Sequence, residues 1–188
     1  MFLDIALGIF SSIFVSHIFG ISLSTQFVIL GIIFNLLPDM DALLVFTKKG
    51  WETDATHRDL FHFPLVYIPI GFLILSHFSQ EATALFVLSS LFHFIHDSIG
   101  IGWGVERLFP FNRNHFAFFY VYSPNEMKLP WKLMYIWPHK QIGKMMEEYG
   151  DKKWIQNIYF KFHPYALFEY GSFVLALFIF FLLQYGHV

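Results

Sequence analysis

Five long apolar runs dominate this chain of 188 residues and restrict how it can fold. They cover residues 2–19, 22–37, 63–78, 82–101 and 166–185. A helix that crosses the hydrocarbon core of a bilayer needs about 20 apolar residues, with a range of about 17–25. The last run has that length, whereas the second and third are short and imply local thinning of the bilayer or helix ends buried in protein. We therefore predict an all-α fold: a polytopic membrane bundle of about five apolar helices.

The composition favours a membrane protein over the alternative, a soluble helical bundle with a large apolar core. Apolar residues make up 56% of the chain and charged residues 14%, against about 45–50% and about 25% in soluble domains. The net charge of −2 offers no basic excess for binding nucleic acid, and the lack of cysteine excludes disulfides and thiolate metal sites. The first run lacks a basic start and a cleavage site, so we expect it to be retained.

Lysine and arginine are confined to residues 48–58 and 107–161. If each apolar run crosses the membrane once, both stretches lie on one side, which the positive-inside rule makes the cytoplasm. We therefore expect a multi-pass protein of a bacterial or archaeal cell membrane with its N-terminus inside. Basic and aromatic residues together are typical of a lipid interface. We divide the chain into a membrane bundle (1–102), a cytoplasmic interfacial segment (103–163) and a C-terminal membrane helix (164–188).

Three short motifs place ionisable side chains where apolar runs begin or end. "LLPDMDAL" follows the second run, "ATHRDLFHFP" leads into the third, and "LFHFIHDSIG" lies near the end of the fourth. Their candidate functional residues are Asp39, Asp41, His57, Arg58, His62, His93, His96 and Asp97. Each motif alone also fits an ordinary role: a turn or helix cap, a hydrated loop at the bilayer edge, or a buried structural histidine.

In the predicted topology all three motifs reach the cytoplasmic membrane surface. His93 and Asp97 are four residues apart on a helix and therefore share a face. Ionisable residues in an apolar helix usually face a bundle interior or a watery cavity. Imidazole nitrogens and carboxylate oxygens at one depth suit a divalent metal, Zn²⁺ first, with Mn²⁺ or Fe as alternatives. Six or more such ligands can hold one ion or two.

The order of these motifs resembles the LexA-regulated, membrane-bound metal-dependent hydrolases over roughly residues 1–115. That family has a PDxD element, an HR-x-x-x-H element that starts a span, and an H-x-x-x-D element followed by glycine and a Pro-Phe or similar pair. The matching residues are Asp39, Asp41, His57, Arg58, His62, His93, Asp97, Gly102 or Gly104, Pro110 and Phe111. Asp59, Phe61 and Phe63 depart from the usual Gly, Thr and Ser. Asp4 stands where relatives tend to carry a histidine, and we include it as a candidate ligand.

The resemblance implies a hydrolase whose metal-activated water attacks a phosphoester or lipid-like ester at the cytoplasmic membrane face. His96 then serves as general acid or base, or orients Asp97. Arg58, together with Arg107 and Arg113, holds anionic oxygens of the substrate or of a lipid headgroup. For Arg107 and Arg113, ordinary anchoring at the interface is the alternative.

Two other classes of function stay open at this stage. A transporter of metal ions or small solutes would use Glu169, the acidic residue in the last run, although the candidate ligands cluster at one surface. A non-catalytic membrane adaptor would hold a structural metal and bind its partner through residues 103–163.

Overall fold

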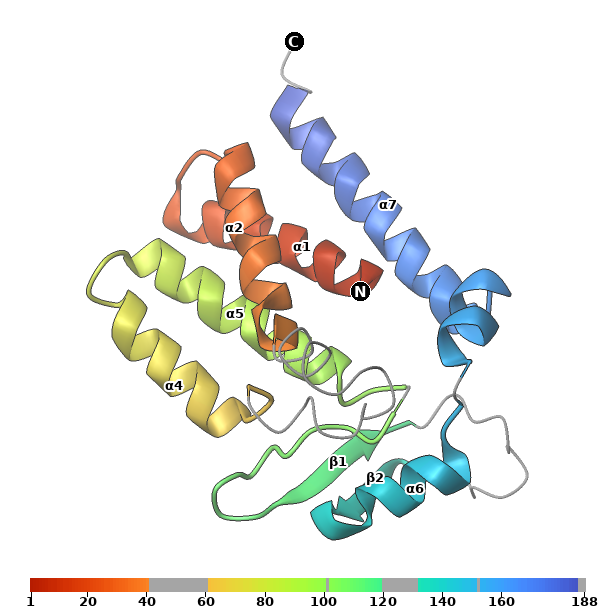
Figure 1. The fold of residues 1–188 in the computed structure, drawn as a ribbon. Coiled ribbons are helices and arrows are strands. Elements are labelled where there is room, and N and C mark those ends of the chain that lie inside the picture. Colours follow the sequence, from red (N-terminus) through yellow and green to blue (C-terminus); the bar gives the residue numbers. More distant parts are fainter. Residues whose placement is uncertain (41–60, 101, 120–131, 152, 186–188) are drawn as a thin grey trace. The chain divides into compact units, whose positions relative to one another are not determined.

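The structure is a computed structural model of the chain and describes residues 1–40, 61–100, 102–119, 132–151 and 153–185. It is mostly helical, with one two-stranded sheet among the described residues (Figure 1). The chain divides into two compact units, which we call the helical unit and the hairpin unit. The helical unit comprises Met1–Pro38, Ile68–His93 and Leu167–Val188, and the hairpin unit comprises Asp39–Tyr67 and Phe94–Ala166.

Each of the five apolar runs forms a helix, as predicted. The helices are α1 (Phe2–Phe19), α2 (Thr25–Leu36), α4 (Pro64–Leu75), α5 (Gln80–His96) and α7 (Pro164–Tyr185). Local signals set their ends. Ser24 caps α2 by accepting a hydrogen bond from the backbone N–H of Phe27. Gly20 ends α1 in the left-handed conformation, with φ of 63°.

Two of these helices are long and apolar enough to cross a membrane, judged by length and composition. They are α1, with 18 residues, and α7, with 22 residues. Helices α2 and α4 have 12 residues each, which gives a rise of about 18 Å against a hydrocarbon core of about 30 Å. The predicted bundle of five spans is therefore not confirmed, because turns and caps take up the ends of the shorter apolar runs.

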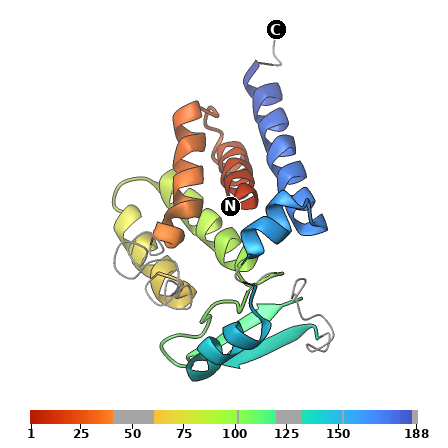
Figure 2. The same cartoon turned by 45° about the vertical axis from the view of Figure 1, so that its right-hand side comes forward.

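Glycine residues allow α1 and α2 to pack closely in the helical unit (Figures 1 and 2). A Cβ added to Gly8 would lie 2.6 Å from the Cα of Ile32, and one added to Gly31 would lie 2.6 Å from the carbonyl oxygen of Gly8. Small residues at such a crossing let two backbones approach, as is common between membrane helices. The buried core beside this crossing consists of Ala6, Ile9, Val28, Ala176 and Phe180.

The hairpin unit contains the sheet, which corrects the all-α prediction. Strand β1 (Asn114–Phe118) pairs antiparallel with β2 (Met134–Pro138). Burial alternates along β1, with His115 and Ala117 buried, as expected of a strand covered on one face. Aromatic residues favour strands, so the aromatic clusters that we interpreted only as interfacial also build a hairpin.

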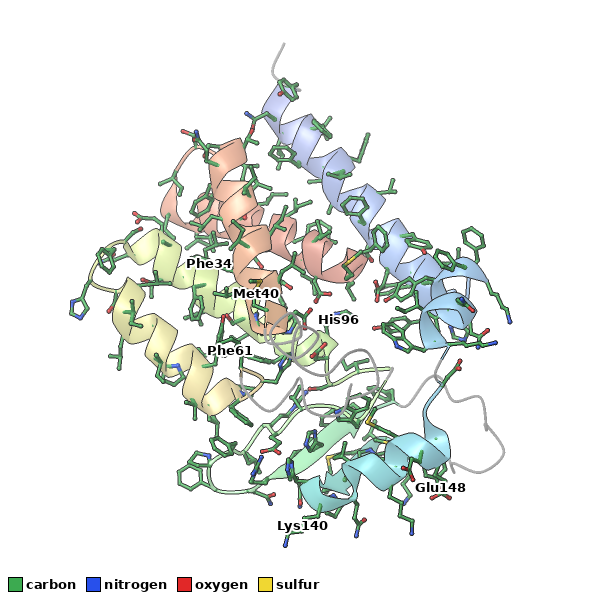
Figure 3. All side chains as sticks on the ribbon, viewed as in Figure 1. Phe34, Met40, Phe61, His96, Lys140 and Glu148 are labelled. Carbon is green, nitrogen blue, oxygen red and sulfur yellow. The ribbon has the colours of Figure 1, made fainter. Side chains whose placement is uncertain are left out.

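Helical segments follow β2 in the hairpin unit. After a short turn, η3 (His139–Gln141), α6 (Ile142–Tyr149) runs beside the hairpin in both ribbon views (Figures 1 and 2). The side chains of Lys140 and Glu148 point away from the strands (Figure 3). A single π-helical turn, η4 (Gln156–Phe160), comes next. The division at residues 102 and 163 stays a prediction.

Candidate metal centre

Three of the predicted ligands converge in the hairpin unit. The Nε2 atom of His62 lies 3.4 Å from Oδ1 of Asp39 and 3.1 Å from Oδ2 of Asp97. One ligand atom from each residue lies within 4.8 Å of the other two. The side chain of His62 is fully buried and that of Asp97 nearly so, whereas 44% of the Asp39 side chain is exposed. The cluster is thus closed around the imidazole and accessible at Asp39.

The ends of three helices bring these side chains together. Asp39 is the last residue of a short 3₁₀ turn, η1 (Leu37–Asp39), that continues from α2. His62 lies two residues before α4, and Asp97 is the first residue after α5. Behind Asp97, the backbone N–H of Ile99 donates to the carbonyl of His96 at 2.9 Å and closes the turn. The proline in "LLPDMDAL" and the end of the apolar face at "HDSIG" are the sequence signals for these positions.

The chemistry of the three donors fits a cation. Both carboxylates approach the same imidazole nitrogen, and one N–H group can serve only one of these acceptors well. Two negative charges beside a buried ring are costly unless a positive charge compensates them. A divalent ion bound by one nitrogen and two oxygens satisfies all three groups, and such mixed sets suit Zn²⁺, Mn²⁺ or Fe. The rings of Phe94 and His62 are nearly perpendicular, with centroids 6.1 Å apart, and Phe94 adds an apolar wall.

Two further predicted ligands pair in the helical unit. The Nδ1 atom of His93 lies 3.4 Å from Oδ1 of Asp4, and both side chains are buried. His93 lies in α5, four residues before Asp97, which follows the end of that helix. Glu169, near the start of α7, is also buried and accepts a hydrogen bond from the backbone N–H of Leu3 at 3.4 Å.

The comparison with known families covers almost the whole chain. A family model described as YdjM inner membrane protein matches residues 4–185, a range that includes every candidate ligand above. The chain belongs to the YdjM inner membrane protein family. No match was found among curated proteins or among solved structures. The family description and the two candidate spans agree on a membrane location, and the description states no reaction.

The remaining predicted catalytic and metal-binding residues of this YdjM family member either make other contacts or lie outside the described residues. Nε2 of His96 is 2.7 Å from the hydroxyl of Tyr165, and the two rings stack with centroids 6.3 Å apart (His96 is labelled in Figure 3). Asp41, His57 and Arg58 lie outside the described residues. The predicted roles of all these residues stay predictions.

The two arginines that we predicted to bind substrate have partners within the hairpin unit. The Nε–H group of Arg107 donates to Oγ of Ser98 at 3.1 Å, and its guanidinium lies 4.6 Å from the centre of the Phe118 ring. Partial burial lowers the pKa of Arg107. Arg113 pairs with Glu106, its Nε lying 3.2 Å from Oε2. Both arginines thus have partners within the protein, and substrate binding and anchoring at the membrane interface both stay predictions.

Sequence reasoning missed a second group of metal-type ligands in this YdjM family member. Glu106, His115 and His139 offer one ligand atom each, all within 4.8 Å of one another. They come from a loop, from β1 and from the turn after β2, so no helical or strand spacing connects them. Because the segment was predicted to be interfacial, its histidines were not considered as ligands. The segment "NHFAF" gives no signal that would place His115 inside, because its large apolar residues, Phe116 and Phe118, lie on the other face of the strand.

Proposed function

We propose that this protein is a membrane-bound, metal-dependent hydrolase. The metal is held by Asp39, His62 and Asp97. The observation that supports this best is the approach of two carboxylates to one buried imidazole nitrogen, at 3.4 and 3.1 Å. His93, four residues before Asp97, stays a ligand predicted from the sequence. Asp4, in contact with Nδ1 of His93, orients that ring as carboxylates commonly do for metal-bound histidines.

The residues of the centre differ in exposure, and we assign their roles accordingly. His62 is buried and Asp97 is 12% exposed, so these two residues fix the position of the ion, whereas the exposed side of Asp39 is where a substrate enters. A bound divalent ion would lower the pKa of a coordinated water toward neutrality and polarise the scissile group. His96, hydrogen-bonded to Tyr165, is the proton carrier nearest along the chain to Asp97. Its imidazole can exchange a proton with the leaving group or with the phenol.

The proposed membrane location restricts the class of substrate. We place the centre at the cytoplasmic face of a multi-pass protein, because all lysines and arginines fall in two stretches that the topology puts on one side. A centre at this depth meets lipid headgroups, so a phosphoester or a lipid-like ester is the proposed substrate class. Arg58 is the proposed contact for its anionic oxygens.

The test uses the full chain in detergent. Metal is removed with a chelator and restored with Zn²⁺ or Mn²⁺, and hydrolysis of bis-p-nitrophenyl phosphate, p-nitrophenyl phosphate and p-nitrophenyl butyrate is followed. Turnover that depends on added metal and is lost in Asp97→Asn and His62→Ala supports the proposal. The control is His77→Ala, which removes an exposed imidazole far along the chain from the motifs. Metal bound at the centre without turnover of any probe contradicts a hydrolase of these classes and favours the adaptor.

A further inference from the structure

A second cluster in the hairpin unit converges on one carboxylate oxygen. Oε1 of Glu106 lies 3.3 Å from Nε2 of His115 and 2.6 Å from Nδ1 of His139. The imidazole rings are nearly parallel, with centroids 5.8 Å apart and an angle of 19°. Glu106 and His115 are each 1% exposed. None of these residues belongs to the three motifs, and the proposed hydrolase does not use them.

A backbone contact fixes which nitrogen of His115 faces the carboxylate. Nδ1 lies 3.3 Å from the carbonyl oxygen of Gly104, and this oxygen can only accept a hydrogen bond. Nδ1 therefore carries the hydrogen, and in the neutral ring Nε2 carries the lone pair. The lone pair of the neutral ring is repelled by a carboxylate oxygen 3.3 Å away unless a proton or a metal ion lies between them. A histidine that donates one N–H to a backbone carbonyl and offers the other nitrogen is the usual arrangement in metal sites.

Gly104 is required for that carbonyl to reach His115. Its φ is +75°, and an added Cβ would lie 2.0 Å from the carbonyl oxygen of Phe116 in β1. Only glycine lets the loop run this close to the strand. Beside it, Val105 forms an isolated bridge with Phe116, which fixes the loop immediately before Glu106.

Arg113 contacts both oxygens of Glu106 and holds the carboxylate in place. Its Nε–H group donates to Oε2 at 3.2 Å, and its Nη2 reaches Oε1 only at 3.4 Å. The oxygen Oε1 is the one that both imidazoles approach. A guanidinium that contacts both oxygens fixes the orientation of the carboxylate, as partners of metal-binding carboxylates commonly do.

The spacing of the donors is close to that of a tetrahedral zinc site. Bonds of about 2.0–2.1 Å to nitrogen and oxygen place neighbouring donors about 3.3 Å apart, which matches the distance between Glu106 and His115. His139 is closer and has to withdraw by several tenths of an ångström. Its side chain is 31% exposed at the first position of η3, so this movement leaves both strands in place.

We propose that Glu106, His115 and His139 form a second divalent metal site, of the type that binds Zn²⁺. The ion ties the loop before β1, β1 itself and the turn after β2 into one unit. Three protein ligands leave the fourth tetrahedral position for water on the exposed side of His139. The site stabilises the hairpin unit and is independent of the proposed hydrolytic centre.

The test measures zinc in a background that lacks the first centre. The full chain carrying His62→Ala and Asp97→Asn is purified in detergent, stripped, given Zn²⁺ and analysed by mass spectrometry for bound metal. We expect about one ion per chain, and less than about a tenth of that after Glu106→Gln or His115→Ala. Lys140→Ala is the matched control, because Lys140 follows His139 directly and its side chain points away from the hairpin (Figure 3).

A second readout reports the structural role. Zn²⁺ added to the stripped background protein raises Tm by about 3 °C or more, because a ligand that binds only the folded state stabilises it, and this shift is absent in His115→Ala. If the background protein does not fold, the number of zinc ions per chain is measured without His62→Ala and Asp97→Asn. In that chain we expect two ions, and Glu106→Gln should remove one of them. A folded protein that binds no zinc in this background, or keeps it in both variants, overturns the proposal.

Discussion

The Nε2 atom of His62 lies 3.1 Å from Oδ2 of Asp97, which holds the segment before α4 against the turn after α5. Neither residue belongs to a helix, because His62 precedes α4 and Asp97 follows α5. The contact therefore depends on where two helices end. Asp39 adds a second carboxylate to the same nitrogen, and this concentration of negative charge around one imidazole is the basis of the first prediction.

Replacing Asp97 by asparagine should weaken metal binding without unfolding the protein. The change keeps the size of the side chain but removes the negative charge that faces His62. We expect the apparent affinity for Zn²⁺ at this centre to fall by about tenfold or more, with an unchanged far-ultraviolet circular dichroism spectrum. Competition with a chromophoric chelator measures the affinity, and His77→Ala should match the unmodified chain. Equal affinity in Asp97→Asn and the unmodified chain would remove Asp97 from the ligand set.

Acidification should release metal from the first centre. Protons compete with the ion for the imidazole of His62 and for the carboxylates, so affinity falls as the pH is lowered. We expect nearly full occupancy at about pH 7.5 and a clear loss by about pH 5, reversible when the pH is raised. Metal content after dialysis at each pH measures this. Occupancy that does not change over this range would contradict coordination through His62.

Much of the fold could be predicted because apolar runs report burial directly. The runs at 2–19 and 166–185 correspond almost residue for residue to α1 and α7. The hairpin could not be predicted in the same way, because Phe116 and Trp137 serve equally well at a lipid interface and in a strand. Pairing of β1 with β2 joins segments that are far apart along the chain, and no local pattern reports such a partner.

One part of the candidate site could be predicted from the sequence, and another part could not. His93 and Asp97 are joined by helical spacing, and His62 and Asp39 by their positions at helix ends, so sequence reasoning could group them. The cluster of Glu106, His115 and His139 depends on the register of the hairpin and on the close approach of Gly104 to β1. Neither feature has a periodic signal. His96 also contacts the hydroxyl of Tyr165, and no local motif predicts this partner because the two residues are 69 positions apart.

Tyr165→Phe should separate proton transfer from metal binding. The substitution removes the hydroxyl that lies 2.7 Å from His96 but keeps the stacked ring. If His96 carries a proton during hydrolysis, kcat falls severalfold and its pH profile shifts, whereas the metal content stays the same. His96→Gln should show a larger loss of kcat. Unchanged profiles for both variants would leave His96 with a structural role only.

The crossing of α1 and α2 should not tolerate a side chain at Gly8. An added methyl group would lie 2.6 Å from the backbone of Ile32, so Gly8→Ala forces the helices apart and should cost about 1–3 kcal/mol of unfolding free energy. Gly171→Ala in α7 is the matched control, because nothing lies within 4 Å of its added Cβ, and alanine favours a helix by up to about 1 kcal/mol. Thermal unfolding in detergent compares them. Equal stability of the two variants would contradict the close crossing.

The predicted orientation in the membrane can be tested by labelling single cysteines, because the chain has none of its own. His77, between α4 and α5, lies in a connection without lysine or arginine, whereas Lys140 lies in the basic segment. The positive-inside rule puts Lys140 in the cytoplasm and His77 outside. A membrane-impermeant maleimide added to spheroplasts should therefore label His77→Cys at once and Lys140→Cys only after the cells are lysed.

Both side chains lie in exposed positions, so a difference in labelling reports the membrane side rather than burial. If Lys140→Cys reacts as fast as His77→Cys in intact spheroplasts, the basic segment is not cytoplasmic, and a hydrolytic centre at the inner face is excluded.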